Sequence, residues 1–87
     1  EAMKNSSENG LPSLVIAERK LPEMDGIVLL DRLKKQFKKK IPFFFLTVYS
    51  SDQDISEGLS HGALEYIVKP FNMKILTEKI LATLEGQ

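Results

Sequence analysis

Three short apolar runs without polar alternation stand out along the chain. They occupy residues 14–17 (Leu-Val-Ile-Ala), 43–46 (Phe-Phe-Phe-Leu) and 66–68 (Tyr-Ile-Val). Uninterrupted runs of this length are typical of strands covered on both faces, as in a parallel sheet. We predict three buried strands, whose carboxyl ends are at Glu18, Thr47 and Lys69.

Helical patterns follow each predicted strand. The first helix begins near Gly26 and ends before Pro42, whose ring blocks its continuation. Its apolar stripe consists of Ile27, Leu30, Leu33 and Phe37. A weaker helix covers residues 52–61, with Ser51 as its N-cap, and Asn72 caps the last helix. The apolar side of that helix consists of Met73, Leu76, Ile80 and Leu84.

The beginning of the chain lacks such a pattern. Residues 1–5 are interpreted as the last turn of a helix, and residues 6–11 as a loop, because Ser, Asn and Gly favour turns. We therefore divide the chain into a remnant, residues 1–11, and one domain, residues 12–87. The order strand–helix, repeated three times, predicts an α/β fold of three layers, with a parallel sheet and right-handed crossovers.

Composition narrows the classes of partner and site that the chain can have. The chain has 87 residues, with 12 cationic and 12 anionic side chains, so its balance does not favour nucleic acid or membrane partners. It contains no Cys, which excludes disulfides and thiolate metal sites. No apolar run is long enough to span a bilayer and no signal peptide is visible, so we expect a cytoplasmic protein. The first residue, Glu1, is not an initiator Met, which suggests a fragment or a processed chain.

Chemistry is expected at the carboxyl ends of the strands, where such sheets bind ligands. A carboxylate (Glu18), a hydroxyl (Thr47) and an ammonium (Lys69) would converge there. Together they are suited to a phosphoryl group: the Lys neutralises its charge, the hydroxyl donates a hydrogen bond, and the carboxylate accepts the group or holds a metal. The alternative is a structural Glu18–Lys69 ion pair with Thr47 in a turn.

The stretches "LVIAERKLPEMDG", "IPFFFLT" and "HGALEYIVKPF", in this order, resemble the second half of a response-regulator receiver domain, the flavodoxin-like module of two-component signalling. The resemblance runs from about residue 12 to residue 84 and makes residues 12–87 the C-terminal part of such a domain. It implies that Glu18 stands where a histidine kinase phosphorylates an Asp. Thr47 and Lys69 then match the residues that contact the phosphoryl group.

The resemblance assigns three further positions. Tyr66 matches an aromatic switch that turns inward when the hydroxyl residue moves, and Pro70 matches a proline usually preceded by a cis bond. The main-chain carbonyl of Lys20 matches one that binds magnesium. The acidic pair that completes the magnesium site belongs to an earlier strand, and residues 1–11 do not supply it. Mg²⁺, the cofactor of the intact family site, is therefore not expected to find a complete site in this chain alone.

Two departures from the family pattern matter. The acceptor position holds Glu, whose extra methylene carries the carboxylate further into the pocket, and in-line transfer tolerates little misplacement. We expect loss of normal phosphorylation, with Glu18 either mimicking the phosphorylated state through Lys69 or merely inactive. The second departure is length, since the first two strands of the family are absent. The strand at residues 14–17 would then have an open edge, which predicts a homodimer.

Two functions follow as expectations. The first is a non-enzymatic, atypical receiver that transmits a conformational state in a phosphorelay. Its partners would be a histidine kinase or phosphotransfer protein and an output domain or partner protein, without direct nucleic acid binding. The second is a non-phosphorylated pseudo-receiver that acts as an assembly or dimerisation module.

Overall fold

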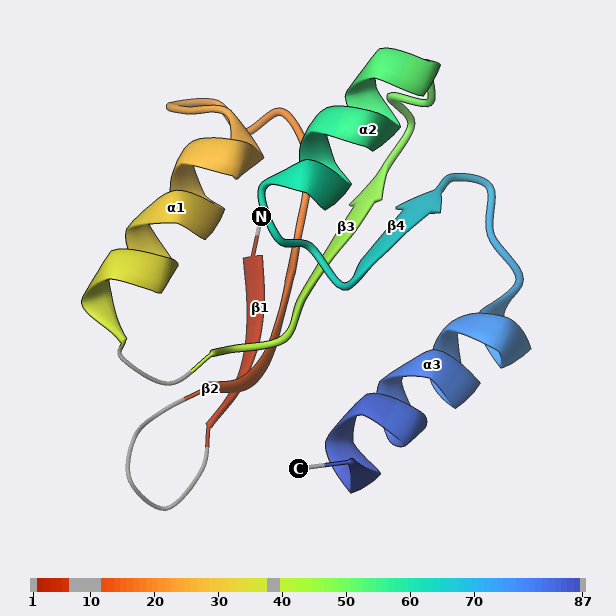
Figure 1. The fold of residues 1–87 in the computed structure, drawn as a ribbon. Coiled ribbons are helices and arrows are strands. Elements are labelled where there is room, and N and C mark those ends of the chain that lie inside the picture. Colours follow the sequence, from red (N-terminus) through yellow and green to blue (C-terminus); the bar gives the residue numbers. More distant parts are fainter. Residues whose placement is uncertain (1, 7–11, 38–39, 87) are drawn as a thin grey trace.

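The structure, a computed structural model, describes residues 2–6, 12–37 and 40–86 (Figure 1). Its elements, in chain order, are β1 (Ala2–Ser6), β2 (Pro12–Ala17), α1 (Gly26–Gln36), β3 (Phe43–Thr47), α2 (Asp52–Ser60), β4 (Glu65–Val68) and α3 (Met73–Glu85). The strands form one sheet in the order β1-β2-β3-β4, in which β2, β3 and β4 are parallel. The predicted α/β fold with a three-stranded parallel sheet and three helices is confirmed.

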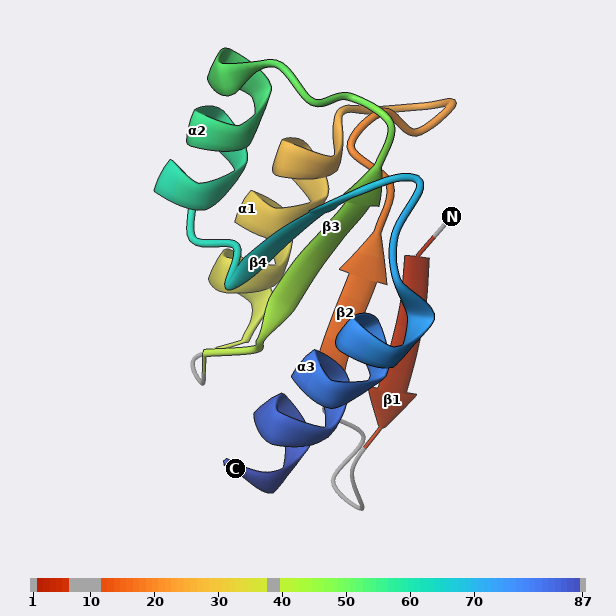
Figure 2. The same ribbon diagram turned by 90° about the vertical axis from the view of Figure 1, so that its right-hand side faces the viewer.

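Helices cover both faces of the sheet, with α1 and α2 on one side and α3 on the other (Figure 2). The run of phenylalanines explains this arrangement, because successive side chains of a strand point to opposite faces. Phe43 and Phe45 lie in the core beneath α1, whereas Phe44 packs against Leu76 of α3. All three rings are fully buried, so the run is core, as its lack of alternation predicted.

Side-chain caps define where each helix begins. Asp25 accepts a hydrogen bond from the Ile27 N–H, Ser51 from the Asp54 N–H, and Asn72 from the Ile75 N–H. Each of these bonds satisfies one of the amide groups that a helix N-terminus leaves without an intrahelical partner. The predicted caps at Ser51 and Asn72 are therefore confirmed.

A close approach explains why α2 contains a glycine that lowers its intrinsic helicity. A Cβ atom at Gly58 would lie 2.8 Å from Cδ2 of Tyr66 and 3.1 Å from Cδ2 of Phe45. The backbone of α2 therefore packs directly on the Tyr66 ring. Of the α2 residues, Gly58 is also the one that is fully buried.

The beginning of the chain differs from the prediction. Residues Ala2–Ser6 form a strand, not the end of a helix, and pair with β2 in antiparallel register, with Lys4 opposite Val15. The physical reason is the edge of β2, whose backbone N–H and C=O groups need partners. The open β2 edge from which a homodimer was predicted is therefore occupied by β1. The loop predicted for residues 6–11 lies outside the described residues from residue 7 on, and Ser6 belongs to β1.

Within the described ranges, every helix is too short or too polar to cross a membrane.

Candidate functional site

The carboxyl ends of β2, β3 and β4 lie at one edge of the sheet because these strands are parallel. Glu18 directly follows β2, Thr47 ends β3, and Lys69 directly follows β4. The Lys69 Nζ lies 3.5 Å from Oε1 of Glu18, and the Thr47 hydroxyl donates a hydrogen bond to the Glu18 carboxylate. The predicted convergence of a carboxylate, a hydroxyl and an ammonium group is confirmed as geometry.

The carboxylate of Glu18 is held in its charged form. Burial raises its pKa, but four effects together outweigh burial: hydrogen bonds from Thr47, from the Arg19 N–H and from the Lys69 side chain, and the charge of Lys69. The result is a Glu18 pKa below its ordinary value of 4.5. The Arg19 N–H donates to Oε2 of Glu18 at 2.7 Å, so both carboxylate oxygens have partners.

Main-chain bonds fix the neighbouring strand ends. Thr47 is fully buried, and its hydroxyl accepts a bond from the Tyr49 N–H at 3.2 Å. Its carbonyl accepts a bond from the Lys69 N–H at 2.7 Å, which ties the end of β4 to the end of β3. The Lys69–Pro70 peptide bond is cis, as the resemblance implied.

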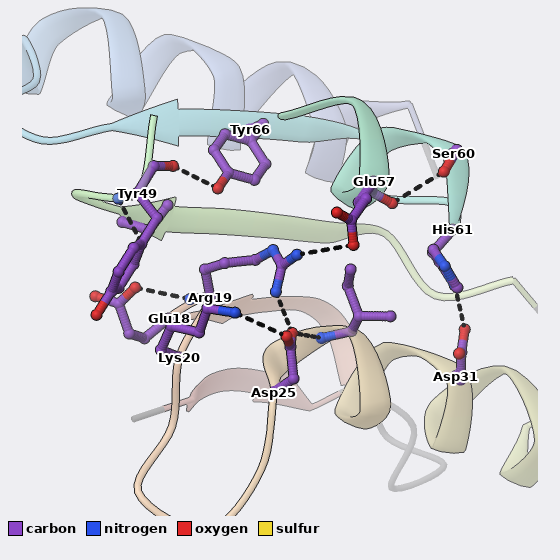
Figure 3. A network of polar contacts seen from close by, with 12 residues as sticks. Glu18, Arg19, Lys20, Asp25, Asp31, Tyr49, Glu57, Ser60, His61 and Tyr66 are labelled. Atoms are coloured by element: carbon purple, nitrogen blue, oxygen red, sulfur yellow. Dashed lines mark hydrogen bonds and ion pairs between the residues drawn. The ribbon is translucent and has the colours of Figure 1, made fainter. Parts of the chain in front are cut away.

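Tyr66 contacts the loop that follows β3. Its hydroxyl donates to the carbonyl of Tyr49 at 2.5 Å (Figure 3). Its ring is tilted against Phe45, with a centroid distance of 5.6 Å. Burial raises the Tyr66 pKa above its ordinary value, and the nearby Arg19 charge counteracts only part of that rise. The aromatic side chain is thus half-buried and hydrogen-bonded to the loop that carries Tyr49.

Arg19 is the main feature that the sequence analysis missed. This residue directly follows Glu18, and it is 1% exposed. Its guanidinium reaches two carboxylates: Nη1 bonds to Asp25, and Nη2 lies 3.4 Å from Oε2 of Glu57 (Figure 3). The only sequence signal is an Arg where a buried strand ends, with Asp25 six positions later. Glu57 is 38 positions away, so local sequence could not reveal it.

A magnesium ion does not fit the side chains at this edge. In the part of the chain that the structure describes, no three His, Asp or Glu side chains gather to hold a metal ion. Glu18 is paired with Lys69, and the Asp25 carboxylate is bonded to Ile27, Arg19 and Lys20. Mg²⁺ requires near-octahedral oxygen coordination and usually at least one free carboxylate. The Lys20 carbonyl alone would not supply such a site.

His61 lies away from this edge, at the end of α2, where its contacts are with residues of α1. It is the C-cap of α2, and its Nδ1 lies 3.2 Å from Oδ1 of Asp31 on α1 (Figure 3). The Lys34 ammonium donates to the His61 carbonyl at 2.6 Å. Gly62, the next residue, has a φ of 114°, which suits glycine after a helix end. His61 therefore joins two helices.

Known proteins are similar to this chain in both sequence and fold. The family model described as response regulator receiver domain matches residues 1–81. The chain is 42% identical over 87 residues to histidine kinase P4 of Formosa agariphila, covering 99% of this chain and 6% of that protein. It is 39% identical over 72 residues to the transcriptional regulatory protein ZraR of Escherichia coli K12, covering 79% of this chain and 16% of that protein.

A solved structure agrees with these sequence matches. The CheY-like response regulator receiver domain protein from Methanospirillum hungatei JF-1 superposes with a TM-score of 0.78 at 34% identity, covering 91% of this chain and 62% of the other. The chain thus spans a small part of the curated relatives and under two thirds of this solved receiver. Because the match extends over nearly the whole chain in both sequence and fold, this protein belongs to the response regulator receiver domain family.

Proposed function

We propose that this chain is a receiver module of a two-component phosphorelay, whose state is set at Glu18 by its pairing with Lys69. The observation that carries the proposal is the 3.5 Å contact between Oε1 of Glu18 and Nζ of Lys69 at the strand ends. Thr47 and Tyr66 would report the state of this pair, the first through its hydroxyl and the second through the loop at Tyr49.

Glu18 is proposed not to be a working phospho-acceptor. Its two carboxylate oxygens already have the partners that a phosphoryl group would need, namely Lys69 and the Arg19 N–H. An attacking oxygen must also be in line with the leaving group, and the additional methylene of Glu changes its position. A resident carboxylate paired with Lys69 would place negative charge near where a phosphoryl group otherwise binds, as in partial mimicry of the phosphorylated state.

A phosphoryl-donor experiment tests the acceptor statement. The chain is incubated with phosphoramidate and Mg²⁺, and labelled peptides are identified by mass spectrometry, with Glu18→Gln as the matched control. We expect no label on Glu18. A stable label on Glu18 that is lost in Glu18→Gln would overturn the statement.

A second experiment tests whether the site is a switch. Glu18→Gln removes the charge of the carboxylate, so the amide resonances of Thr47 and Tyr66 should shift in this variant. Beryllofluoride with Mg²⁺ should leave the parent chain unchanged, because Glu18 and Lys69 are already paired. Unchanged resonances in Glu18→Gln would instead favour the alternative function.

That alternative is a pseudo-receiver that acts in assembly without switching. Two observations support it: the Glu18–Lys69 pair needs no phosphoryl group, and metal-binding side chains do not cluster among the described residues. Both functions are non-enzymatic. Both are proposed to act in the cytoplasm through protein partners, without nucleic acid contact. The partners proposed for the first function are a histidine kinase or phosphotransfer protein and an output domain.

The homodimer stays a proposal, but it can no longer rest on an open β2 edge. Since β1 closes the edge of β2, a dimer at that edge requires β1 of one copy to pair with β2 of the other across a two-fold axis. Light scattering after size exclusion measures the mass over a range of concentrations. A monomer mass throughout would contradict the dimer.

A further inference from the structure

The Arg19 guanidinium is a buried charge with two anionic partners among the described residues. Its side chain is 2% exposed, while the side chains of Asp25 and Glu57 are 32% and 45% exposed. Its Nε finds no hydrogen-bond partner in residues 2–6, 12–37 and 40–86. A buried cation is costly unless it is paired, so the two acids are needed to keep the guanidinium inside.

The two acids lie at different helices, and one of those helices buries a glycine rather than a large apolar side chain. Asp25 is the N-cap of α1, whereas Glu57 lies within α2. In α2, Gly58 is the buried residue, and Leu59 is 44% exposed. Apolar packing holds most helices in place, and the contact between Arg19 and Glu57 adds a charged tether to the packing of Gly58 on Tyr66.

The main chain of Arg19 contacts the strand-end site directly. Its N–H donates to Oε2 of Glu18 at 2.7 Å, and its carbonyl accepts a bond from the Gly26 N–H at 2.7 Å. Its side chain extends from there toward Glu57 (Figure 3). One residue therefore contacts the carboxylate of position 18 with its backbone and α2 with its guanidinium.

We propose that Arg19 is a positioning residue that transmits the state of position 18 to α2 through Glu57. A change of charge at Glu18 weakens the bond from the Arg19 N–H and shifts the Arg19 main chain, and the guanidinium passes that shift to Glu57. The inference rests on the proposed function insofar as position 18 sets the state of the module. The tether between Arg19 and Glu57 does not depend on whether Glu18 is phosphorylated.

Hydrogen exchange tests the tether. Glu57→Gln keeps the shape of the side chain and removes its charge, and Glu78→Gln on an exposed position of α3 is the matched control. We expect amide exchange within residues 52–60 to accelerate on the order of threefold to tenfold in Glu57→Gln, as expected for loss of one partly exposed charged contact. The amides of β3 and the control variant should stay unchanged. Unchanged exchange in α2 of Glu57→Gln would overturn the proposal.

A double variant tests the transmission. Glu18→Gln alone should accelerate exchange in α2, whereas Glu18→Gln combined with Glu57→Gln should add nothing to Glu57→Gln alone. A purely structural role of Glu57 would instead give additive effects. Additive effects, or no response of α2 to Glu18→Gln, would overturn the transmission by Arg19. The phosphoryl-donor experiment reports on Glu18 alone, so a label there would overturn the statement that Glu18 is not a working acceptor without affecting the tether.

Discussion

Glu18 contributes folding free energy that depends on pH. Its pKa in the folded chain lies below 4.5, because the lowering by Thr47, the Arg19 N–H and Lys69 together exceeds the rise caused by burial. A group with a depressed pKa stabilises the fold above its unfolded pKa, and this contribution is lost as pH falls through the folded pKa. Glu18→Gln should therefore lower the free energy of unfolding at pH 7 by about 0.5–1 kcal/mol, since Lys69 is partly exposed.

The measurement is urea unfolding of the parent chain and Glu18→Gln between pH 7 and pH 2. The difference between them should shrink below pH 4.5, the ordinary value of this carboxyl. Glu78→Gln, on an exposed position, should show little difference at any pH. A difference for Glu18→Gln that grows toward low pH would have the wrong sign for this account.

Gly26 is required by a close approach of backbones. A Cβ atom there would lie 2.8 Å from Cε1 of Phe45 and closer still to the Glu18 carbonyl oxygen. Neither a core ring nor a strand backbone moves freely, so Gly26→Ala should lower the free energy of unfolding by about 2–3 kcal/mol in urea titration. At Gly86 the nearest such atom is 3.4 Å away, and Gly86→Ala should change stability by less than about 0.5 kcal/mol. Equal effects would contradict the steric argument.

The strand-end residues were predictable, and Arg19 was not. Parallel strands bring their carboxyl ends to one edge, so the positions of Glu18, Thr47 and Lys69 followed from three apolar runs. The burial of Arg19 depends instead on Glu57, which the fold brings from a distant helix. No periodicity encodes such a pairing, because it arises from tertiary packing.

At the scale of elements, the N-caps differ in what they stabilise. Asn72 only caps α3, whereas Asp25 caps α1 and also pairs with the buried Arg19. Asn72→Ala should cost about 1 kcal/mol. Asp25→Ala should cost about 2–3 kcal/mol, because it leaves a buried guanidinium with one partner, an effect reduced by the partial exposure of Asp25.

Thermal or urea unfolding of both variants measures the difference, and Asp25→Asn separates its two causes. Asn retains an oxygen that can accept the Ile27 N–H but has no charge for Arg19. Its stability should lie between those of the parent chain and Asp25→Ala. If Asp25→Ala costs no more than Asn72→Ala, the buried ion pair contributes nothing net to folding.

The elements themselves were predicted well where periodicity was strong. The stripe through Ile27, Leu30 and Leu33 gave α1, and all three side chains are buried. Met73 was expected on the apolar side of α3 but is 65% exposed, because it lies in the first turn of the helix. β1 was missed because residues 1–5 contain no β-branched or aromatic residue, and its partner is chosen by the β2 edge rather than by local preference.

At the scale of the whole molecule, β1 is what closes the sheet on one side. It pairs with β2 from Ala2 opposite Ala17 to Ser6 opposite Pro12. Removing residues 1–6 would leave the N–H and C=O groups along that edge of β2 without protein partners. Such an edge pairs readily with another chain.

Deletion of residues 1–6 should therefore cause the chain to associate as its concentration rises. We expect the mean mass from light scattering to rise with concentration more steeply than for the full chain. The midpoint of thermal unfolding should likewise become concentration-dependent, because association stabilises the folded form by mass action. Replacing residues 1–6 by a Gly-Ser segment of equal length is the control for chain length, and it should behave like the deletion. If the deleted chain stays monomeric with an unchanged unfolding midpoint, β1 does not protect the edge of β2.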